Sequence, residues 1–203
     1  EILGRHRDCY FQVFTNGTLL TADIAAEFRR LGNVTPLISI EGTKRVSDER
    51  RGGSRVLARS LEGLEHCRRS KLFVGVATSV CKSNFEELAT EDFARELCRR
   101  GAHYLWYYLY RPVGADPAPE LCLSAEEVLA LRRFMVDLRS RVPLIVVDAY
   151  WDHEGRALCP AATGISHHIG PGGDIEPCPP VQFARETITD STDLRALLED
   201  SAF

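Results

Sequence analysis

Short apolar runs alternate with longer amphipathic segments over the first 150 residues of the chain. The runs occupy residues 10–14, 37–40, 72–78, 103–110 and 144–147. Each run has the length of a β-strand. The segments between them repeat apolar residues every three or four positions, as in Ile24, Phe28 and Leu31. That spacing is typical of helices with one buried face, so the pattern predicts strands and helices in alternation.

Residues of the types that commonly cap helices precede the amphipathic segments. Thr21 and Thr90 precede two amphipathic segments, and Ser54 precedes a third. Residues 83–86 (SNFE) and 124–127 (SAEE) have the form of a capping box, in which a serine hydroxyl and a glutamate bond the first backbone amides. These positions predict where the connecting helices start.

Strands joined by helices of this length pair in parallel through crossover connections. We therefore predict an α/β fold over residues 1–150, a partial (β/α) barrel of parallel strands. After Tyr150 the helical periodicity stops, and glycine and proline become frequent. Residues 165–169 and 174–176 predict two short strands around a turn, followed by a short helix capped by Asp190 or Ser191. Residues 151–203 are thus expected to form a small cysteine-containing hairpin domain.

Composition narrows the class of protein. With 25 Lys and Arg against 29 Asp and Glu, the net charge of −4 argues against a nucleic-acid binder. The 44% apolar content can fill a core, and no run approaches the roughly 20 apolar residues of a membrane span. No signal peptide opens the chain, which begins at Glu1. We interpret the chain as a fragment or a processed product.

Seven cysteines at irregular spacing do not resemble a secreted disulfide scaffold, so we expect a reducing cytoplasm. Burial as small apolar residues is expected for four of them: Cys9, Cys67, Cys81 and Cys98.

Polar residues follow the apolar runs, where parallel βα folds carry their chemistry. The candidates at these strand ends are Asn16, Ser39, Glu41, Thr78 and Arg111. Ser39 and Glu41 can bond a ribose or an amine; alternatively, Ser39 is a satisfied core hydroxyl and Glu41 caps the Gly42 turn. Arg111 binds an anion or packs against a neighbouring tyrosine. We expect the five to line one concave edge.

Arg51 lies in a charged run, residues 47–51 (SDERR), directly before a predicted helix. Its guanidinium suits bidentate pairing with a carboxylate, and a solvated charge run is the alternative interpretation.

Cys159 and Cys178 flank the turn of the C-terminal domain, with Gly173 between them. Thiolates on hairpin loops suit an iron–sulfur cluster or zinc. Because His167 and His168 lie between the two cysteines, a Cys₂His₂ zinc site is an alternative, as are two unliganded cysteines.

Together these residues resemble the radical S-adenosylmethionine (radical SAM) family, in the branch with a C-terminal SPASM or twitch auxiliary-cluster domain. Residues 14–21 (FTNGTLLT) look like its third-strand TNG motif, and residues 39–42 (SIEG) resemble its fourth-strand S-[IL]-D-G motif with Glu for Asp. Residues 47–51 resemble H-D-x-x-R with Ser for His, and residues 111–114 (RPVG) resemble the sixth-strand R-x-P-x-G form. The spacing of Cys159, Gly173 and Cys178 fits the opening of a SPASM or twitch domain.

The resemblance implies S-adenosylmethionine and [4Fe–4S] clusters as cofactors. Glu41 and Ser39 would face the ribose, Arg51 the methionine carboxylate, and Asn16 the rim near the methionyl group. Thr78 and Arg111 belong to the same predicted cofactor site. Cys159 and Cys178 would hold an auxiliary cluster. The whole protein would cleave S-adenosylmethionine reductively to a 5′-deoxyadenosyl radical that abstracts a hydrogen from a peptide, protein or small molecule. Its electron donor would be a flavodoxin or ferredoxin.

Two parts of the family pattern do not occur in this sequence. The C-x3-C-x2-C loop that binds the catalytic cluster and the G-G-E segment are both missing, so we expect them to precede Glu1 and expect these residues alone to be inactive. The alternative is a non-catalytic α/β binding protein with a zinc-stabilised C-terminal annex. Three closely spaced cysteines upstream of residue 1 would decide for the enzyme.

Overall fold

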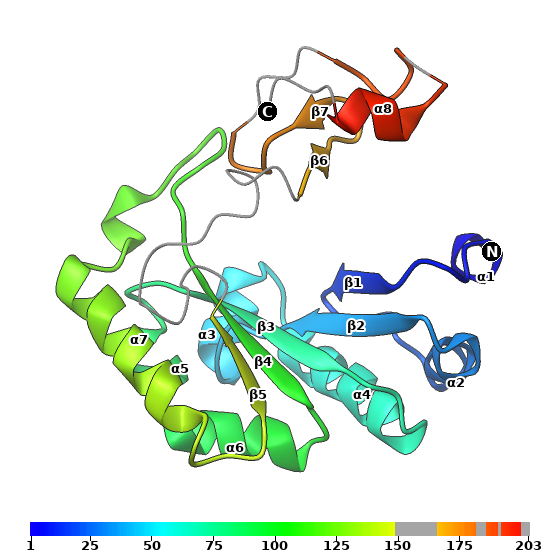
Figure 1. The fold of residues 1–203 in the computed structure, drawn as a ribbon. Coiled ribbons are helices and arrows are strands. Elements are labelled where there is room, and N and C mark those ends of the chain that lie inside the picture. Colours follow the sequence, from blue (N-terminus) through cyan, green and yellow to red (C-terminus); the bar gives the residue numbers. More distant parts are fainter. Residues whose placement is uncertain (149–165, 182–185, 191, 200–203) are drawn as a thin grey trace. The chain divides into compact units, whose positions relative to one another are not determined.

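A computed structural model describes residues 1–148, 166–181, 186–190 and 192–199. The chain divides into two compact units, Glu1–Ala149 and Tyr150–Phe203. Figure 1 shows the elements of both.

The first unit is built on one parallel sheet. Its strands are β1 (Phe11–Thr15), β2 (Val34–Ser39), β3 (Gly75–Val80), β4 (Tyr104–Leu109) and β5 (Ile145–Asp148). Each strand pairs in parallel with the next one along the chain, in the order β1-β2-β3-β4-β5. This is the strand order of consecutive units of a (β/α) barrel, so the predicted fold class is confirmed.

Helices connect the strands and lie along one face of the sheet (Figure 1). The longer ones are α2 (Ala22–Leu31), α4 (Val56–Arg69), α6 (Glu91–Arg99) and α7 (Ala125–Leu138). The shorter ones are α3 (Lys44–Arg50), α5 (Phe85–Leu88) and the 3₁₀ turn η1 (Pro119–Leu121), while α1 (Ile2–Arg5) precedes β1. No helix within the described ranges is long and apolar enough to cross a membrane.

The helix starts agree with the sequence at three positions. The Thr21 hydroxyl accepts from the Ile24 amide at 3.3 Å, and Thr90 accepts from Phe93 at 3.3 Å. Ser124 forms the predicted capping box of α7 with the glutamate three residues on. Each cap satisfies amides that have no partner inside the helix.

The predicted capping box at residues 83–86 is wrong. The N-cap of α5 is Asn84, and its side chain makes no capping bond. The Asn84 amide instead bonds backbone groups of two neighbouring loops. The predicted start of α4 at Ser54 is also early, because the helix begins at Val56 after Arg55 takes a positive φ of 67°.

The core lies between the sheet and these helices. Alternate strand residues such as Ile38, Val76, Leu105 and Val146 are buried there. The same cluster includes Cys67, as predicted, and burial raises the pKa of its thiol to about 12. It therefore acts as a small apolar residue rather than a nucleophile.

Of the other three cysteines that we expected to be buried, one is fully buried, one is half-buried and one is exposed. Cys81 is fully buried beside the end of β3 and Cys98 is half-buried on α6. Cys9 is exposed, so the prediction is wrong there. The residue precedes β1, the edge strand, where no further strand of the described sheet covers it. All six described cysteines are free thiols.

Gly63 lets α4 approach the loop that follows β1. A Cβ at this position would lie 2.5 Å from the carbonyl oxygen of Gly17 and 3.2 Å from Leu20 Cβ. In a helix Gly→Ala normally gains about 1 kcal/mol, but overpacking of this size costs about 1–3 kcal/mol. After this offset we expect Gly63→Ala to lower the free energy of unfolding by up to about 2 kcal/mol, measured by urea denaturation. Gly4→Ala is the control, since its nearest neighbour is a Leu31 methyl at 3.7 Å; equal effects of the two changes would contradict the close approach.

The second unit contains the predicted hairpin. β6 (His168–Ile169) and β7 (Ile175–Glu176) pair antiparallel, and α8 (Leu194–Glu199) follows. The carboxylate of Asp190 accepts from the Thr187 amide, and Asp193 instead accepts from the Ala196 amide at the start of α8. The predicted cap at Asp190 is therefore wrong, and its alternative Ser191 lies outside the described residues.

Candidate functional site

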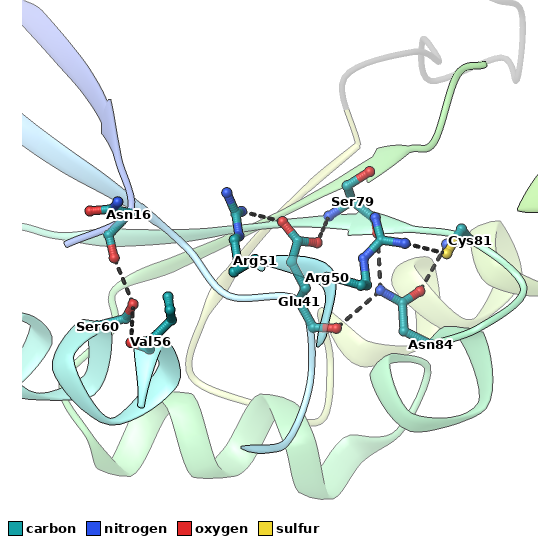
Figure 2. Close-up of polar contacts among 9 residues, drawn as sticks. All are labelled: Asn16, Glu41, Arg50, Arg51, Val56, Ser60, Ser79, Cys81 and Asn84. Atoms are coloured by element: carbon teal, nitrogen blue, oxygen red, sulfur yellow. Dashed lines mark hydrogen bonds and ion pairs between the residues drawn. The ribbon is translucent and has the colours of Figure 1, made fainter. Parts of the chain in front are cut away.

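The carboxyl ends of β2 and β3 meet at one edge of the sheet, and Glu41 lies there (Figure 2). The amide of Ser79 donates to Glu41 Oε2 at 2.8 Å. The guanidinium of Arg51 forms an ion pair with the other oxygen, Oε1. The Glu41 side chain is only 7% exposed, against 29% for Arg51. Burial of a carboxylate is costly unless it has hydrogen-bond and ion-pair partners, and Glu41 has both.

Arg51 reaches Glu41 because residues 44–50 form the helix α3, which the sequence did not predict. Arg51 is the C-cap residue, directly after the last residue of this helix. The Asp48 carboxylate accepts from the amides of Arg55 and Leu57 at 3.0 Å each, and so ties α3 to the start of α4. The charged run is therefore not a solvated loop: its last arginine is an ion-pair partner of the buried carboxylate.

Arg50, the last residue of α3, contacts the end of β3. Its Nη1 donates to Cys81 Sγ at 2.8 Å, and Ser83 Oγ lies 3.1 Å from the same sulfur. These contacts join α3 to the loop after β3, so the two segments that carry Arg51 and Ser79 are held together (Figure 2).

Asn16 lies at the same edge, directly after β1, but its side chain is used locally. Its Oδ1 accepts from the amide and the hydroxyl of Thr18 at 3.0 and 2.8 Å. Its backbone carbonyl accepts from Ser60 Oγ at 2.6 Å, which fastens the turn to α4 (Figure 2). Gly17 has a φ of 74°, which explains the glycine of this motif. Asn16 therefore shapes the rim, and its side chain bonds Thr18 rather than Glu41.

Ser39 and Thr78 lie on opposite faces of the sheet. Ser39 ends β2 and pairs with Ala77, on the face away from the helices. Thr78 pairs with Tyr107, which belongs to the helix-covered core, and Thr78 is 1% exposed. Because side chains alternate along a strand, Thr78 points away from Ser39 and Ser79. The structure does not bring Thr78 to the predicted rim.

Arg111 is exposed and lies two residues beyond β4, at the same edge as Glu41. The structure thus brings Glu41 and Arg51 into contact and places Asn16, Ser39 and Arg111 at neighbouring strand ends. Ser79 and Asn84 contact Glu41 and were not among the predicted site residues. Ser79 lies near the end of β3 and Asn84 follows this strand. The sequence predicted the strand, but it did not show which residues at its end bond Glu41.

The face of the sheet away from the helices is aromatic. Phe14 packs on Trp106 and Tyr108 with ring centroids 6.3 and 6.2 Å apart, and the latter two stack at 5.0 Å. A hollow of about 400 Å³ lies over this face toward the amino ends of the strands, beside Tyr104 and Trp106. Neither it nor a second hollow of about 590 Å³ near Arg68 is lined by residues of the Glu41 edge.

The predicted metal ligands are tested only in part by the described residues. Cys178 is a half-buried free thiol just after β7, while Cys159 lies outside the described residues. Nearby, His168 Nδ1 lies 2.8 Å from Glu176 Oε2 across the hairpin. In the described part of the chain, no three His, Cys, Asp or Glu side chains gather closely enough to hold a metal ion.

Comparison with known proteins gives one sequence relative and several structures. No protein-family model matches the chain. An AdoMet-dependent heme synthase of Methanosarcina barkeri is 36% identical over 85 residues, which are 41% of this chain and 24% of that protein. The anSMEcpe structure with bound AdoMet and Cp18Cys peptide matches 95% of this chain and 58% of its own, with a TM-score of 0.69 and 13% identity. Streptococcus suis SuiB bound to precursor peptide SuiA matches 94% and 48%, with a TM-score of 0.70 and 12% identity.

The two structures share the fold of this chain, and the chain spans about half the length of each. The heme synthase similarity covers a still smaller part of that protein. The solved structures show a likeness of fold, and the heme synthase adds a distant sequence similarity over part of this chain.

Proposed function

We propose that this chain is part of a radical SAM enzyme and that its sheet binds S-adenosylmethionine along the carboxyl edge. The observation that carries the proposal is the meeting of two motif residues, Glu41 and Arg51, which are ten positions apart in sequence and form an ion pair beside the end of β3. Parallel βα folds bind their ligands at this edge.

The hydrogen-bonding groups of the Glu41 edge fit S-adenosylmethionine. A carboxylate has about four acceptor positions, so Glu41 can accept ribose hydroxyls while it keeps Ser79 and Arg51. A guanidinium has five N–H donors and binds carboxylates in a bidentate manner. Arg51 is 29% exposed, which leaves its outer donors accessible to the methionine carboxylate. Ser39 and Arg111 extend the same polar rim.

By resemblance, S-adenosylmethionine bound next to a reduced [4Fe–4S] cluster supplies a 5′-deoxyadenosyl radical for hydrogen abstraction. The residues of this chain do the rest: they bind and orient the cofactor, as proteins do when the cofactor carries the difficult chemistry. The catalytic cluster would be held by a cysteine loop outside these 203 residues.

The substrate class that we propose is a peptide, a protein or a small molecule. Structures of similar fold have been solved with peptides bound, and the sequence relative acts in heme synthesis by its name. A flavodoxin or ferredoxin would deliver the electron. The free thiols of the described cysteines suit a reducing cytoplasm, which is where we place the protein.

We further propose that residues 151–203 begin an auxiliary iron–sulfur domain, with Cys159 and Cys178 as ligands. Replacing both by Ala in the native protein, purified anaerobically, should lower its iron and sulfide content by up to about four atoms each, one cluster. Cys98→Ala is the control, because Cys98 is also half-buried but lies on α6. Unchanged iron in the double variant would reject a ligand role.

The test of the proposed function is whether the native protein forms 5′-deoxyadenosine from S-adenosylmethionine under a strong reductant. Product formation that needs Glu41 supports the proposal. A native protein with reconstituted clusters that forms none would favour the non-catalytic binding protein instead.

A further inference from the structure

Asn84 is a buried amide that joins the two loops of the Glu41 edge. It is 2% exposed and follows β3 by four residues. Its Nδ2 donates to the carbonyl of Glu41 at 3.0 Å and to the carbonyl of Ser79 at 3.1 Å. Its Oδ1 accepts from the amide of Cys81 at 2.8 Å. Both side-chain donors are therefore used, one on each loop.

These bonds close a ring of three residues. Asn84 holds the backbone of Glu41, the Glu41 carboxylate accepts from the Ser79 amide at 2.8 Å, and Asn84 holds the carbonyl of Ser79. Figure 2 shows these residues, with Arg51 on the side of the Glu41 carboxylate away from Asn84. The position of the Glu41 carboxylate is thus set by its own bond to the Ser79 amide and by the Asn84 side chain, which holds the backbones of Glu41 and Ser79 together.

The backbone of these loops depends on Asn84 for its hydrogen bonds. The pairing of β2 with β3 extends only as far as Ser39 and Ala77. Beyond it the amide of Ile40 still donates to the Ala77 carbonyl, and the next links between the loops are those of Asn84 and the Glu41 carboxylate. Buried carbonyls need such partners, and an asparagine provides two donors from one side chain.

We infer that Asn84 is a positioning residue for the cofactor site: it sets the direction of the Glu41 carboxylate and acts on the ligand only through it. The inference rests on the proposed function, because it assumes that Glu41 contacts S-adenosylmethionine. Asn84 itself has both donors occupied and is too deeply buried to be a ligand-contacting group.

The test compares Asn84→Asp with Thr35→Val in the native protein. Asp keeps the acceptor for Cys81 but loses both donors. Thr35 is also buried and bonds the Phe73 carbonyl at 2.9 Å, but it lies at the amino end of β2. Asn84→Asp should raise the exchange rate of the Ser79 amide, and weaken S-adenosylmethionine binding, about tenfold or more each. Thr35→Val should change neither beyond its effect on global stability. Asn84→Ala repeats the measurement if the Asp variant does not fold.

A double-mutant cycle with Glu41→Ala separates positioning from general destabilisation. If Asn84 acts through Glu41, Asn84→Asp should weaken binding much less in the Glu41→Ala background, which lacks the carboxylate. Additive effects, or equal losses in Thr35→Val, would overturn the inference. If the wild-type protein does not bind S-adenosylmethionine, the proposed function fails, whereas unchanged Ser79 exchange in Asn84→Asp overturns the positioning role itself.

Discussion

These 203 residues alone are expected to release no 5′-deoxyadenosine from S-adenosylmethionine, even with a strong reductant. The radical chemistry proposed here would need an electron from an iron–sulfur cluster. In the family that the chain resembles, three cysteines on a short loop would hold this cluster. No two cysteines of this chain are closer than the 14 positions between Cys67 and Cys81, so no such loop can be built from it.

A native protein that carries the cysteine loop ahead of Glu1 should form the product under the same conditions. The measurement is chromatography of 5′-deoxyadenosine after anaerobic cluster reconstitution, with the 203-residue chain assayed in parallel. Product from that chain alone would mean that it contains a cluster site of another kind. No product from the native protein would contradict the assignment to a radical SAM enzyme.

Glu41→Ala in the native protein should weaken S-adenosylmethionine binding on the order of 10- to 100-fold. The lost contact is charge-assisted and lies at a nearly buried carboxylate, where one such interaction contributes about 1–3 kcal/mol. The change also leaves the Ser79 amide and the Arg51 guanidinium without their partner. Glu41→Gln keeps the size of the side chain and should lose less affinity, because one oxygen can still accept.

Glu65→Ala is the matched control for this substitution. Glu65 also binds guanidiniums, those of Arg68 and Arg69, but on the surface of α4. These two arginines lower the pKa of its carboxyl to about 2, so it is charged at any assay pH near neutrality. Binding measured by isothermal titration should be unchanged in Glu65→Ala. An equal loss in both variants would show that a carboxylate at residue 41 has no special role.

The sequence pattern could not show on which side of the sheet each residue of β3 lies. β3 is buried on both faces, so periodicity could not tell which of Thr78 and Ser79 faces the helices. Thr78 was predicted at the rim and lies in the helix-covered core, whereas Ser79 binds Glu41. In a strand buried on both sides, only its register with its neighbours decides this.

The helix α3 shows a second reason why part of the site was not predicted. Residues 44–50 contain one large apolar residue, Val46, so they have no apolar face for periodicity to reveal. The helix and its C-cap Arg51 are held by contacts with residues outside them: Arg50 bonds Cys81, 31 positions away, and Arg51 pairs with Glu41. Local pattern carries no information about partners that are far away in the sequence.

The sequence by itself determined the five strands, their parallel pairing, three of the helix starts and the C-terminal hairpin. These features follow from local periodicity, from capping residues and from the rule that strands joined by helices pair in parallel. Only the tertiary structure decided that Arg51 pairs with Glu41, that Ser79 and Asn84 complete the edge, and that Thr78 does not belong to it. The contacts of Glu41 with Ser79 and Asn84 join residues about 40 positions apart, and they form only when the sheet brings its carboxyl ends together.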